Sequence, residues 1–260
     1  MTLTFGPGPF AKPSSGTLNG DLWSVLPDHA VFTHPVEKRI RAELAGATVA
    51  DTTSAVLLHE TGYLPVYYLP LADIRAEALE PSDTVTTCPF KGQARYHHLR
   101  VGDRVVPDAV WSYPEPIAGV EVLAELCSIR TDAVDQWFEE DQPVRGHPRD
   151  PFHRIDCLPS SRTVVVTAGD TELARSTRPV ALFETGLPAR FYIPVDDVSA
   201  ELTATATSTY CPYKGEADYV AAAGIDDVAW RYQAPFSESA AIAGLVCFDP
   251  AKVTVRVDPT

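Results

Sequence analysis

The sequence has few cations for its many acids, and it has no long apolar run. Among 260 residues, Asp and Glu number 35 against 21 Lys and Arg, a formal net charge of −14. Nucleic-acid phosphates and anionic membrane surfaces both attract clustered Lys and Arg, so this balance argues against both partners. The sequence contains no run of about 18 apolar residues, the length that could span a bilayer as a helix. The N-terminus lacks the charged and apolar regions of a secretory signal, so we expect a cytoplasmic protein.

Cysteine and histidine are also sparse in the patterns that bind metals. The five Cys contain no CxxC pair, which excludes a disulfide framework and a four-Cys zinc site. The adjacent His97 and His98 would point to opposite faces of a strand. We therefore predict no metal and no other cofactor. All seven His lie at or before His153, so we expect whatever both halves of the chain do to proceed without histidine.

What the sequence does contain is an internal repeat. Glu60-Thr61-Gly62 returns as Glu184-Thr185-Gly186, 124 residues later, and Cys88-Pro89-Phe90-Lys91-Gly92 returns as Cys211-Pro212-Tyr213-Lys214-Gly215, 123 residues later. Trp111-Ser112-Tyr113 matches Trp230-Arg231-Tyr232. Separate motifs repeated in one order indicate a tandem duplication.

The repeat and the turn residues between its copies set the expected domain limits. Pro143, Gly146, Pro148 and Pro151 indicate a linker. We predict an N-terminal arm at 1–30, with Leu22 and Trp23 docked on the body, copy one at 31–142, the linker at 143–156 and copy two at 157–260.

Each copy is expected to be mainly β, a small tent-like or sandwich domain with short helices. Short β-branched runs alternate with turn signals. The predicted strands include Ile40–Leu44, Thr48–Ala50, Ala55–His59, Val66–Leu69, Tyr96–Arg100, Arg162–Val166, Val180–Phe183 and Arg190–Ile193. Short helices are expected at Leu71–Leu79, at its counterpart Val195–Leu202 and at Ala133–Glu140.

The repeated CP(F/Y)KG segment is the most specific candidate for chemistry. A nearby cation favours thiolate, the reactive form of cysteine, so Cys88 and Cys211 are candidate nucleophiles, or buried structural thiols. Lys91 and Lys214 are two of only five Lys. They are candidate anchors for an anionic substrate, or partners of a neighbouring acid.

The Glu of each ETG motif and the surrounding aromatic residues complete the candidate site. Glu60 and Glu184 end apolar stretches, where burial would suit a general acid or base. They could instead accept turn hydrogen bonds or pair with Lys91 and Lys214. The aromatic residues are core or pocket wall. The candidate ligand-binding residues are Tyr68, Tyr96, His98 and Trp111, together with Glu184, Tyr192, Cys211, Lys214, Trp230 and Tyr232. Glu60, Cys88, Lys91 and Tyr113 are the candidate catalytic residues.

Together these motifs resemble the DUF427 family, a domain of unknown function with a nucleotidyltransferase-like label (NTP_transf_9). The resemblance rests on ETG at Glu60, Tyr67-Tyr68-Leu69-Pro70, CPFKG at Cys88 and Trp111-Ser112-Tyr113-Pro114-Glu115-Pro116, and on their counterparts in copy two. It implies a compact β domain similar to β-tent folds. The sequence has no Gly-rich phosphate loop, and it lacks the paired CxxC motifs with which better-known β-tent domains hold zinc.

These observations leave two main hypotheses for function. The first is an enzyme that acts on a small anionic or carbonyl-bearing metabolite, in which a Lys binds the substrate and a Glu moves protons. The second is a non-catalytic module that binds a small ligand, or a scaffold for protein contacts. Copy one keeps the fuller motif, so we expect the main site there. The oligomeric state stays open.

Overall fold

The structure is a computed structural model that describes residues 28–258. The chain forms two compact units that divide between Asp150 and Pro151, and each is described by itself. Most of the predicted arm, including Leu22 and Trp23, lies outside the described residues. The unit before the division is called copy one and the unit after it copy two.

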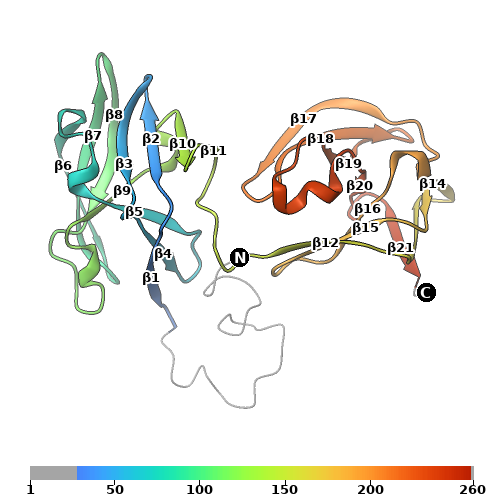
Figure 1. The fold of residues 1–260 in the computed structure, drawn as a ribbon, viewed down its shortest axis with the longest axis horizontal. Helices are drawn as coiled ribbons and strands as arrows, with labels where there is room; N and C mark the ends of the chain where they lie inside the picture. The colour runs from blue at the N-terminus through green and yellow to red at the C-terminus, as the bar shows by residue number, and fades with distance from the viewer. Residues whose placement is uncertain (1–27, 259–260) are drawn as a thin grey trace. The chain divides into compact units, whose positions relative to one another are not determined.

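Copy one consists of two antiparallel sheets (Figure 1). The larger sheet has the strand order β1-β4-β5-β9-β8-β7-β6, and the smaller has the order β11-β10-β2-β3. The strands are β1 (Val31–Pro35), β2 (Ile40–Leu44), β3 (Ala47–Thr52), β4 (Val56–Glu60), β5 (Val66–Pro70), β6 (Leu79–Cys88), β7 (Gly92–Val101), β8 (Arg104–Ser112), β9 (Leu126–Ile129), β10 (Gln136–Glu139) and β11 (Gln142–Val144).

Copy two repeats this layout with more interruptions. An isolated bridge between Ile193 and Val246 joins β12-β15-β16 to β20-β19-β18-β17, and a separate sheet has the order β14-β13-β21. The strands are β12 (Ile155–Pro159), β13 (Thr163–Ala168), β14 (Thr171–Ser176), β15 (Val180–Glu184), β16 (Arg190–Tyr192), β17 (Thr203–Cys211), β18 (Gly215–Ala222), β19 (Ile225–Tyr232), β20 (Cys247–Phe248) and β21 (Thr254–Asp258). The fold is thus mainly β in two similar units, as the sequence predicts.

Helical structure is limited to short 3-10 turns in the described residues. They are η2 (Leu71–Asp73), η3 (Ala76–Ala78), η4 (Glu121–Leu123), η5 (Thr131–Ala133), η6 (Val195–Asp197) and η7 (Ser237–Ile242). The predicted helix at Leu71–Leu79 is therefore two separate turns, η2 and η3, and the predicted helix at Val195–Leu202 is the single turn η6. The helix predicted at Ala133–Glu140 is wrong beyond its first residue, because β10 occupies Gln136–Glu139 and pairs with β2.

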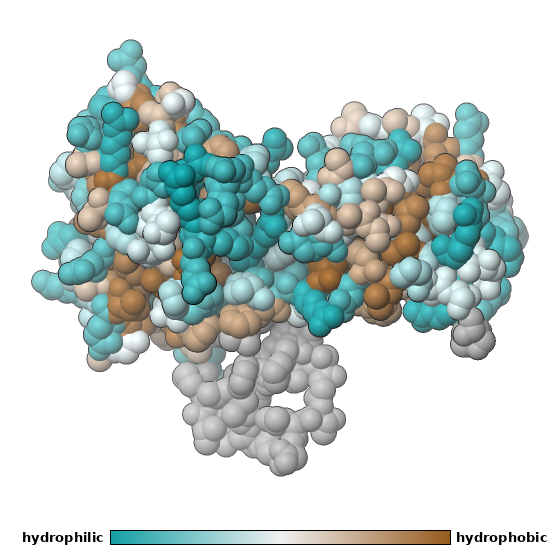
Figure 2. Space-filling view, viewed as in Figure 1, coloured by the Kyte–Doolittle hydropathy of each residue, from teal (hydrophilic) through white to brown (hydrophobic). Residues whose placement is uncertain are grey.

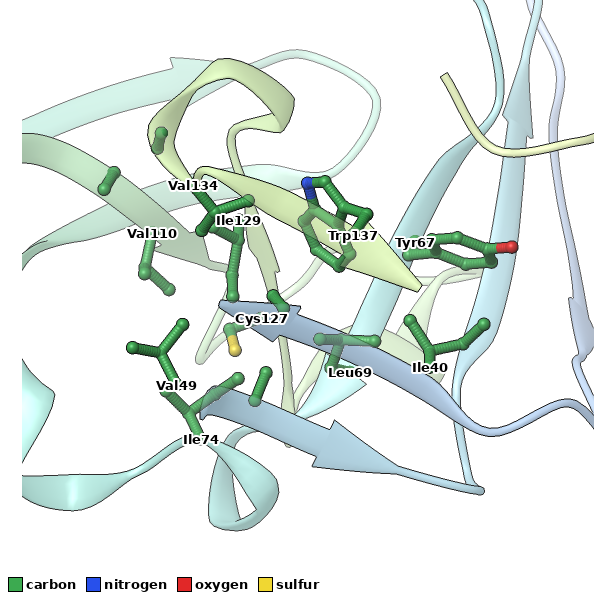
Figure 3. Close-up of a cluster of buried hydrophobic side chains, with 14 of the residues drawn as sticks. Ile40, Val49, Tyr67, Leu69, Ile74, Val110, Cys127, Ile129, Val134 and Trp137 are labelled. Carbon is green, nitrogen blue, oxygen red and sulfur yellow. The ribbon is translucent and has the colours of Figure 1, made fainter. Parts of the chain in front are cut away.

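The core of copy one lies between its two sheets. Residues of both contribute, among them Ile40 from the smaller sheet and Leu69 and Val110 from the larger one, all fully buried. Figure 3 shows this cluster, with Trp137 of β10 beside Tyr67 of β5. Burying such side chains contributes roughly 1.5–3 kcal/mol each, so this interface holds the two layers together.

The opposite face of the larger sheet carries a second cluster, and this face positions the candidate site. Strand side chains alternate between faces. Thus Tyr67 belongs to the core between the sheets, whereas its neighbour Tyr68 packs with Leu58 and Tyr113 on the other face. Copy two separates its side chains in the same way: Ile193 joins the inter-sheet core, and Tyr192 joins the cluster with Tyr232.

Hydrophilic residues cover much of each copy in the space-filling view, with apolar residues in patches (Figure 2). Within residues 28–258, no helix is long and apolar enough to cross a membrane.

Candidate functional site

The ETG motif is a turn that ties two segments together. Glu60 ends β4, and Gly62 follows with a φ of +81°, a conformation that glycine adopts readily. The Thr61 hydroxyl accepts a hydrogen bond from the Ala30 amide at 3.0 Å, and the Thr61 amide donates to the Ala30 carbonyl at 3.1 Å. Thr61 therefore fixes the segment before β1 beside Glu60. Thr185 holds Arg154 by the same pair of bonds in copy two.

The CP(F/Y)KG motif is the turn of a hairpin between β6 and β7. Cys88 pairs with Gly92 across the hairpin, and Gly92 has a φ of +107°. A Cβ on Gly92 would lie 3.0 Å from the Glu115 carbonyl oxygen. The glycine thus allows the loop after Trp111-Ser112-Tyr113 to cross close to the hairpin, where the Ile117 amide donates to the Lys91 carbonyl.

These two turns bring Lys91 and Glu60 together as a buried ion pair. Lys91 Nζ donates to Glu60 Oε2, and only 9% of the lysine side chain and 11% of the glutamate side chain are exposed. Of the alternatives that the sequence left open, the pairing of Glu60 with Lys91 is therefore the one observed. Burial of an ion pair costs several kcal/mol per ion unless further hydrogen bonds compensate, so the surroundings of this pair are informative.

A histidine completes each pair, which the sequence reasoning missed. His29 Nε2 lies 3.0 Å from Glu60 Oε1, and the imidazole stacks on Phe90 with ring centroids 3.6 Å apart. Because a carboxylate only accepts hydrogen bonds, Nε2 carries the proton. The expectation that both copies act without histidine is wrong: His153 stands 124 residues after His29, the offset of the ETG motifs.

Copy two builds the same triad. Lys214 Nζ lies 2.5 Å from Glu184 Oε2, His153 Nε2 lies 3.0 Å from Glu184 Oε1, and His153 stacks on Tyr213. Burial raises the pKa of Glu184, but the His153 hydrogen bond and the Lys214 charge outweigh burial and hold that pKa below its ordinary value. Glu184 is therefore a carboxylate at neutral pH.

Aromatic residues form a wall next to each triad. In copy one the Trp111 indole donates to the Tyr68 hydroxyl at 3.1 Å, and the two rings meet edge to face. In copy two Trp230 donates to Tyr192 at 3.2 Å. Burial raises the pKa of Tyr68 far above its ordinary value, and burial also raises that of Tyr113. The phenols are thus neutral and have protons to donate.

Glu60, Lys91 and the aromatic wall of copy one line a cleft of about 880 Å³. This volume lies within the roughly 300–1,000 Å³ of small-molecule sites. The cleft gathers six of the predicted site residues, and apolar side chains such as Leu58 and Leu64 fill the gaps between them. The six are Glu60, Tyr68, Lys91, Tyr96, Trp111 and Tyr113.

Two predicted residues of copy one do not line this cleft. Cys88 is half-buried and packs against the cluster that contains Tyr68 and Tyr113. His98 accepts a hydrogen bond from the Asp108 amide at 2.9 Å, and Asp108 rather than His98 lines the cleft. Asp108 and Arg130 line it without having been predicted, although Asp108 recurs as Asp227 at the offset of 119 residues that relates Trp111 to Trp230.

The predicted residues of copy two also converge on one face. Tyr192 and Tyr232 are buried in the cluster against which Cys211 and Trp230 pack, beside the Glu184–Lys214 pair. Within residues 28–258, no three His, Cys, Asp or Glu side chains gather as ligands for a metal.

Comparison with known proteins bears on the family of the chain. No curated protein matches it. A model of the domain of unknown function DUF427 matches residues 32–140 and matches residues 156–259 a second time. The two matches cover most of the sequence and coincide with the two copies of the ETG and CP(F/Y)KG motifs. The chain therefore belongs to the DUF427 family and contains its domain twice in tandem.

Proposed function

We propose that copy one is the site of an enzyme that acts by proton transfer on a small metabolite with a carbonyl or carboxylate group. The observation that carries this proposal is the buried Glu60–Lys91 pair, held by His29 at the wall of an aromatic cleft. A cleft of this size suits a metabolite, and its aromatic wall suits an apolar or planar body.

Lys91 is the group that would hold the substrate oxygen. An ammonium has three N–H donors. One is directed at Glu60, and no second acceptor side chain for Lys91 is found among residues 28–258. The other donors are available to a carbonyl or carboxylate oxygen in the cleft. Inside a largely apolar site such a charge-assisted hydrogen bond is stronger than in water.

Glu60 is the group that would move the proton. A carboxylate beside the bound carbonyl accepts a proton from the adjacent carbon, the C–H electron pair becomes the enolate, and Lys91 holds the enolate oxygen. Glu60 then returns the proton either to the carbon that lost it or to another carbon conjugated with the enolate. Atoms and electrons balance without a co-reactant. His29 is a positioning residue, since it fixes Glu60 Oε1 and does not line the cleft.

Non-catalytic capture of the same ligand is the second candidate. Both oxygens of Glu60 already accept a hydrogen bond, one from Lys91 and one from His29. A carboxylate held in this way is suited to orienting a lysine permanently, and a binding module needs nothing more.

A ligand search with matched variants tests the site. The protein is incubated with a metabolite extract and analysed by native mass spectrometry as wild type, Lys91→Met and Lys214→Met. Both substitutions break an equivalent buried pair, so their losses of stability should be similar. We expect a retained species on the wild type and on Lys214→Met that is missing from Lys91→Met. Loss from Lys214→Met alone would move the site to copy two, and no retained species on any form would favour a scaffold.

Deuterium exchange then separates the enzyme from the binding module. The retained metabolite is incubated with the protein in D2O and followed by ¹H NMR. An enzyme of the proposed kind replaces the hydrogen beside the carbonyl with deuterium, and Glu60→Gln stops the exchange while binding persists. Binding without exchange by the wild type would contradict catalysis and leave capture as the function.

A further inference from the structure

Arg130 adds a second cation to the cleft of copy one. The preceding strand β9 directs Leu126 to the cluster of Tyr68 and Ile129 to the core between the sheets. Because side chains alternate along a strand, Arg130 returns to the site face, the face of the larger sheet that carries Tyr68, and it lines the cleft. Its side chain is 47% exposed against 9% for Lys91, so Arg130 lies at the rim and Lys91 lies deeper.

The guanidinium of Arg130 is held in place but still has donors to offer. Its Nε donates to Asp132 Oδ1 at 2.6 Å, and its Nη1 lies 3.5 Å from the Pro107 carbonyl oxygen. Asp132 is 76% exposed, and solvent screens such a surface pair, so another anion can replace it. Asp108, the acid that lines the cleft, already accepts hydrogen bonds from two hydroxyls of β6. Within residues 28–258, no acceptor is found for Arg130 Nη2.

Copy two has an acid at the position of Arg130. The Arg130 amide donates to the Ala109 carbonyl, and the Asp249 amide donates to the Val228 carbonyl, both at 2.8 Å. Ala109 and Val228 are 119 residues apart, which is the offset between the two tryptophan motifs. The same offset relates Arg130 to Asp249, so the charge at this position is reversed between the copies.

An arginine reaches the equivalent face of copy two from the neighbouring strand. Arg190 of β16 stands where copy one has Val66 of β5, since Arg190 pairs with Leu182 as Val66 pairs with Leu58. The Arg190 guanidinium lies 5.8 Å from the ring centroid of Trp230, on the face that carries the triad of copy two. The site face of copy two has thus exchanged the strand that carries its arginine.

The two arginine positions are neighbours across the strands. In copy one, the register of β5 on β9 sets Val66 opposite Arg130, and in copy two the bridge that joins β16 to β20 sets Arg190 opposite Asp249. Burial raises the pKa of the Cys247 thiol to about 12, and the charges of Arg190 and Asp249 both act on it as well. Each copy therefore keeps a guanidinium at the same place on its site face, although packing alone would not require the charge to be kept.

We propose that Arg130 binds a carboxylate of the substrate at the rim of the cleft, so that the substrate is an oxo acid with its carbonyl on Lys91 and its acid group on Arg130. A planar guanidinium binds a carboxylate through two parallel hydrogen bonds, and the substrate would replace Asp132. Two cations at different depths of one cleft fix the substrate at two points, which orients its C–H bond toward Glu60. This inference rests on the proposed proton-transfer function and narrows its class of substrate.

Paired probes of similar shape separate the carboxylate from the rest of the ligand. A short series of phenyl oxo acids, from 4-oxo-4-phenylbutanoate to 6-oxo-6-phenylhexanoate, is titrated into the full chain beside the matching methyl esters. The protein contains 5-fluorotryptophan, and the ¹⁹F resonance of Trp111 reports binding in the cleft. We expect the best acid to bind more tightly than its ester. Arg130→Gln should weaken binding of the acid roughly tenfold to a hundredfold and leave binding of the ester unchanged.

The strand exchange of copy two supplies a rescue. Val66→Arg combined with Arg130→Asp recreates the arrangement of copy two in copy one, and it should restore the preference for the acid that Arg130→Gln loses. Arg175→Gln is the matched control, because Arg175 also forms a surface ion pair, with Glu172, and its loss should change neither affinity. Circular dichroism and thermal unfolding establish that each variant folds.

The outcomes distinguish this inference from the function on which it rests. If Arg130→Gln left binding of the acid intact while Lys91→Met abolished binding of both probes, the role of Arg130 would be overturned and the site at Lys91 would stand. If Lys91→Met left the ester bound, the proposed function itself would fail. Equal affinity of the wild type for acid and ester, no saturable binding of either, or a folded exchange variant without the preference would also overturn the inference.

Discussion

The Glu184–Lys214 pair offers a sharp test of what the buried triads do for stability. Lys214→Met keeps the length of the side chain but removes its charge. Glu184 would then remain a carboxylate with 7% exposure, and His153 would be its remaining ion-pair partner among residues 28–258. Glu184→Gln removes the carboxylate instead and leaves the Lys214 ammonium buried.

The expected magnitudes follow from burial. Removing one partner of a buried pair costs about 3–5 kcal/mol, because the other charge stays uncompensated. We expect each single variant to lose stability in this range at pH 8. The double variant leaves no uncompensated charge, so its loss should be smaller than the sum of the single losses by up to about 3 kcal/mol.

The measurement must report copy two alone, and the tryptophans allow this. Trp230 is the only Trp after the division between the copies. Urea titrations of protein labelled with 5-fluorotryptophan, followed by ¹⁹F NMR, give the free energy of unfolding from the Trp230 resonance. Additive losses of less than about 1 kcal/mol per variant would place the pair with ordinary surface ion pairs and refute the reasoning.

Three further outcomes are expected from the same structure. Gly92→Ala should cost about 1–3 kcal/mol, and Gly215→Ala should cost less, since a Cβ would meet its nearest atom at 3.0 Å in the first case and 3.5 Å in the second; equal losses in urea titrations would rule out that contact as the cause. Burial raises the pKa of Cys127 and of Cys247 to about 12, so neither should react with iodoacetamide at pH 8 until the chain unfolds. Modification of either thiol in native protein, detected by mass spectrometry, would contradict this. The pKa of Glu184 lies below its ordinary value of 4.5, so its contribution to stability is present above about pH 4.5 and is lost as the pH falls through the lowered pKa. Glu184→Gln should therefore flatten the acid limb of the stability profile, and an unchanged limb would exclude Glu184 as its source.

Much of the fold could be predicted from the sequence because its strands carry strong local signals. Ile40–Leu44 alternates buried and half-buried positions, and the turn at Ala45 and Gly46 follows directly. The strands β6 and β17 were not predicted, because they are rich in Thr and mostly exposed and thus show no apolar alternation. A short helix was expected over Ala133–Glu140, but the pairing of Gln136–Glu139 with β2 decides the conformation there.

The candidate site was predictable where its residues belong to repeated sequence motifs, and it was missed where they do not. Glu60 and Lys91 were found because the motifs around them recur. His29 and His153 stand among unlike neighbours, so no motif marks them. The available signal was spacing, since each histidine precedes its glutamate by 31 residues. The physical reason is that the ETG threonine, and not the sequence around the histidine, holds that segment in place.

The position of these histidines affects how the two copies should be separated for individual study. The family match to copy two begins at residue 156, and a fragment cut there would lose His153 together with the Arg154 backbone that Thr185 binds. Such a fragment would keep the recognisable motifs and still present an incomplete triad. An expression boundary upstream of Pro151, where the second compact unit begins, preserves the histidine. For copy one the boundary must likewise precede His29.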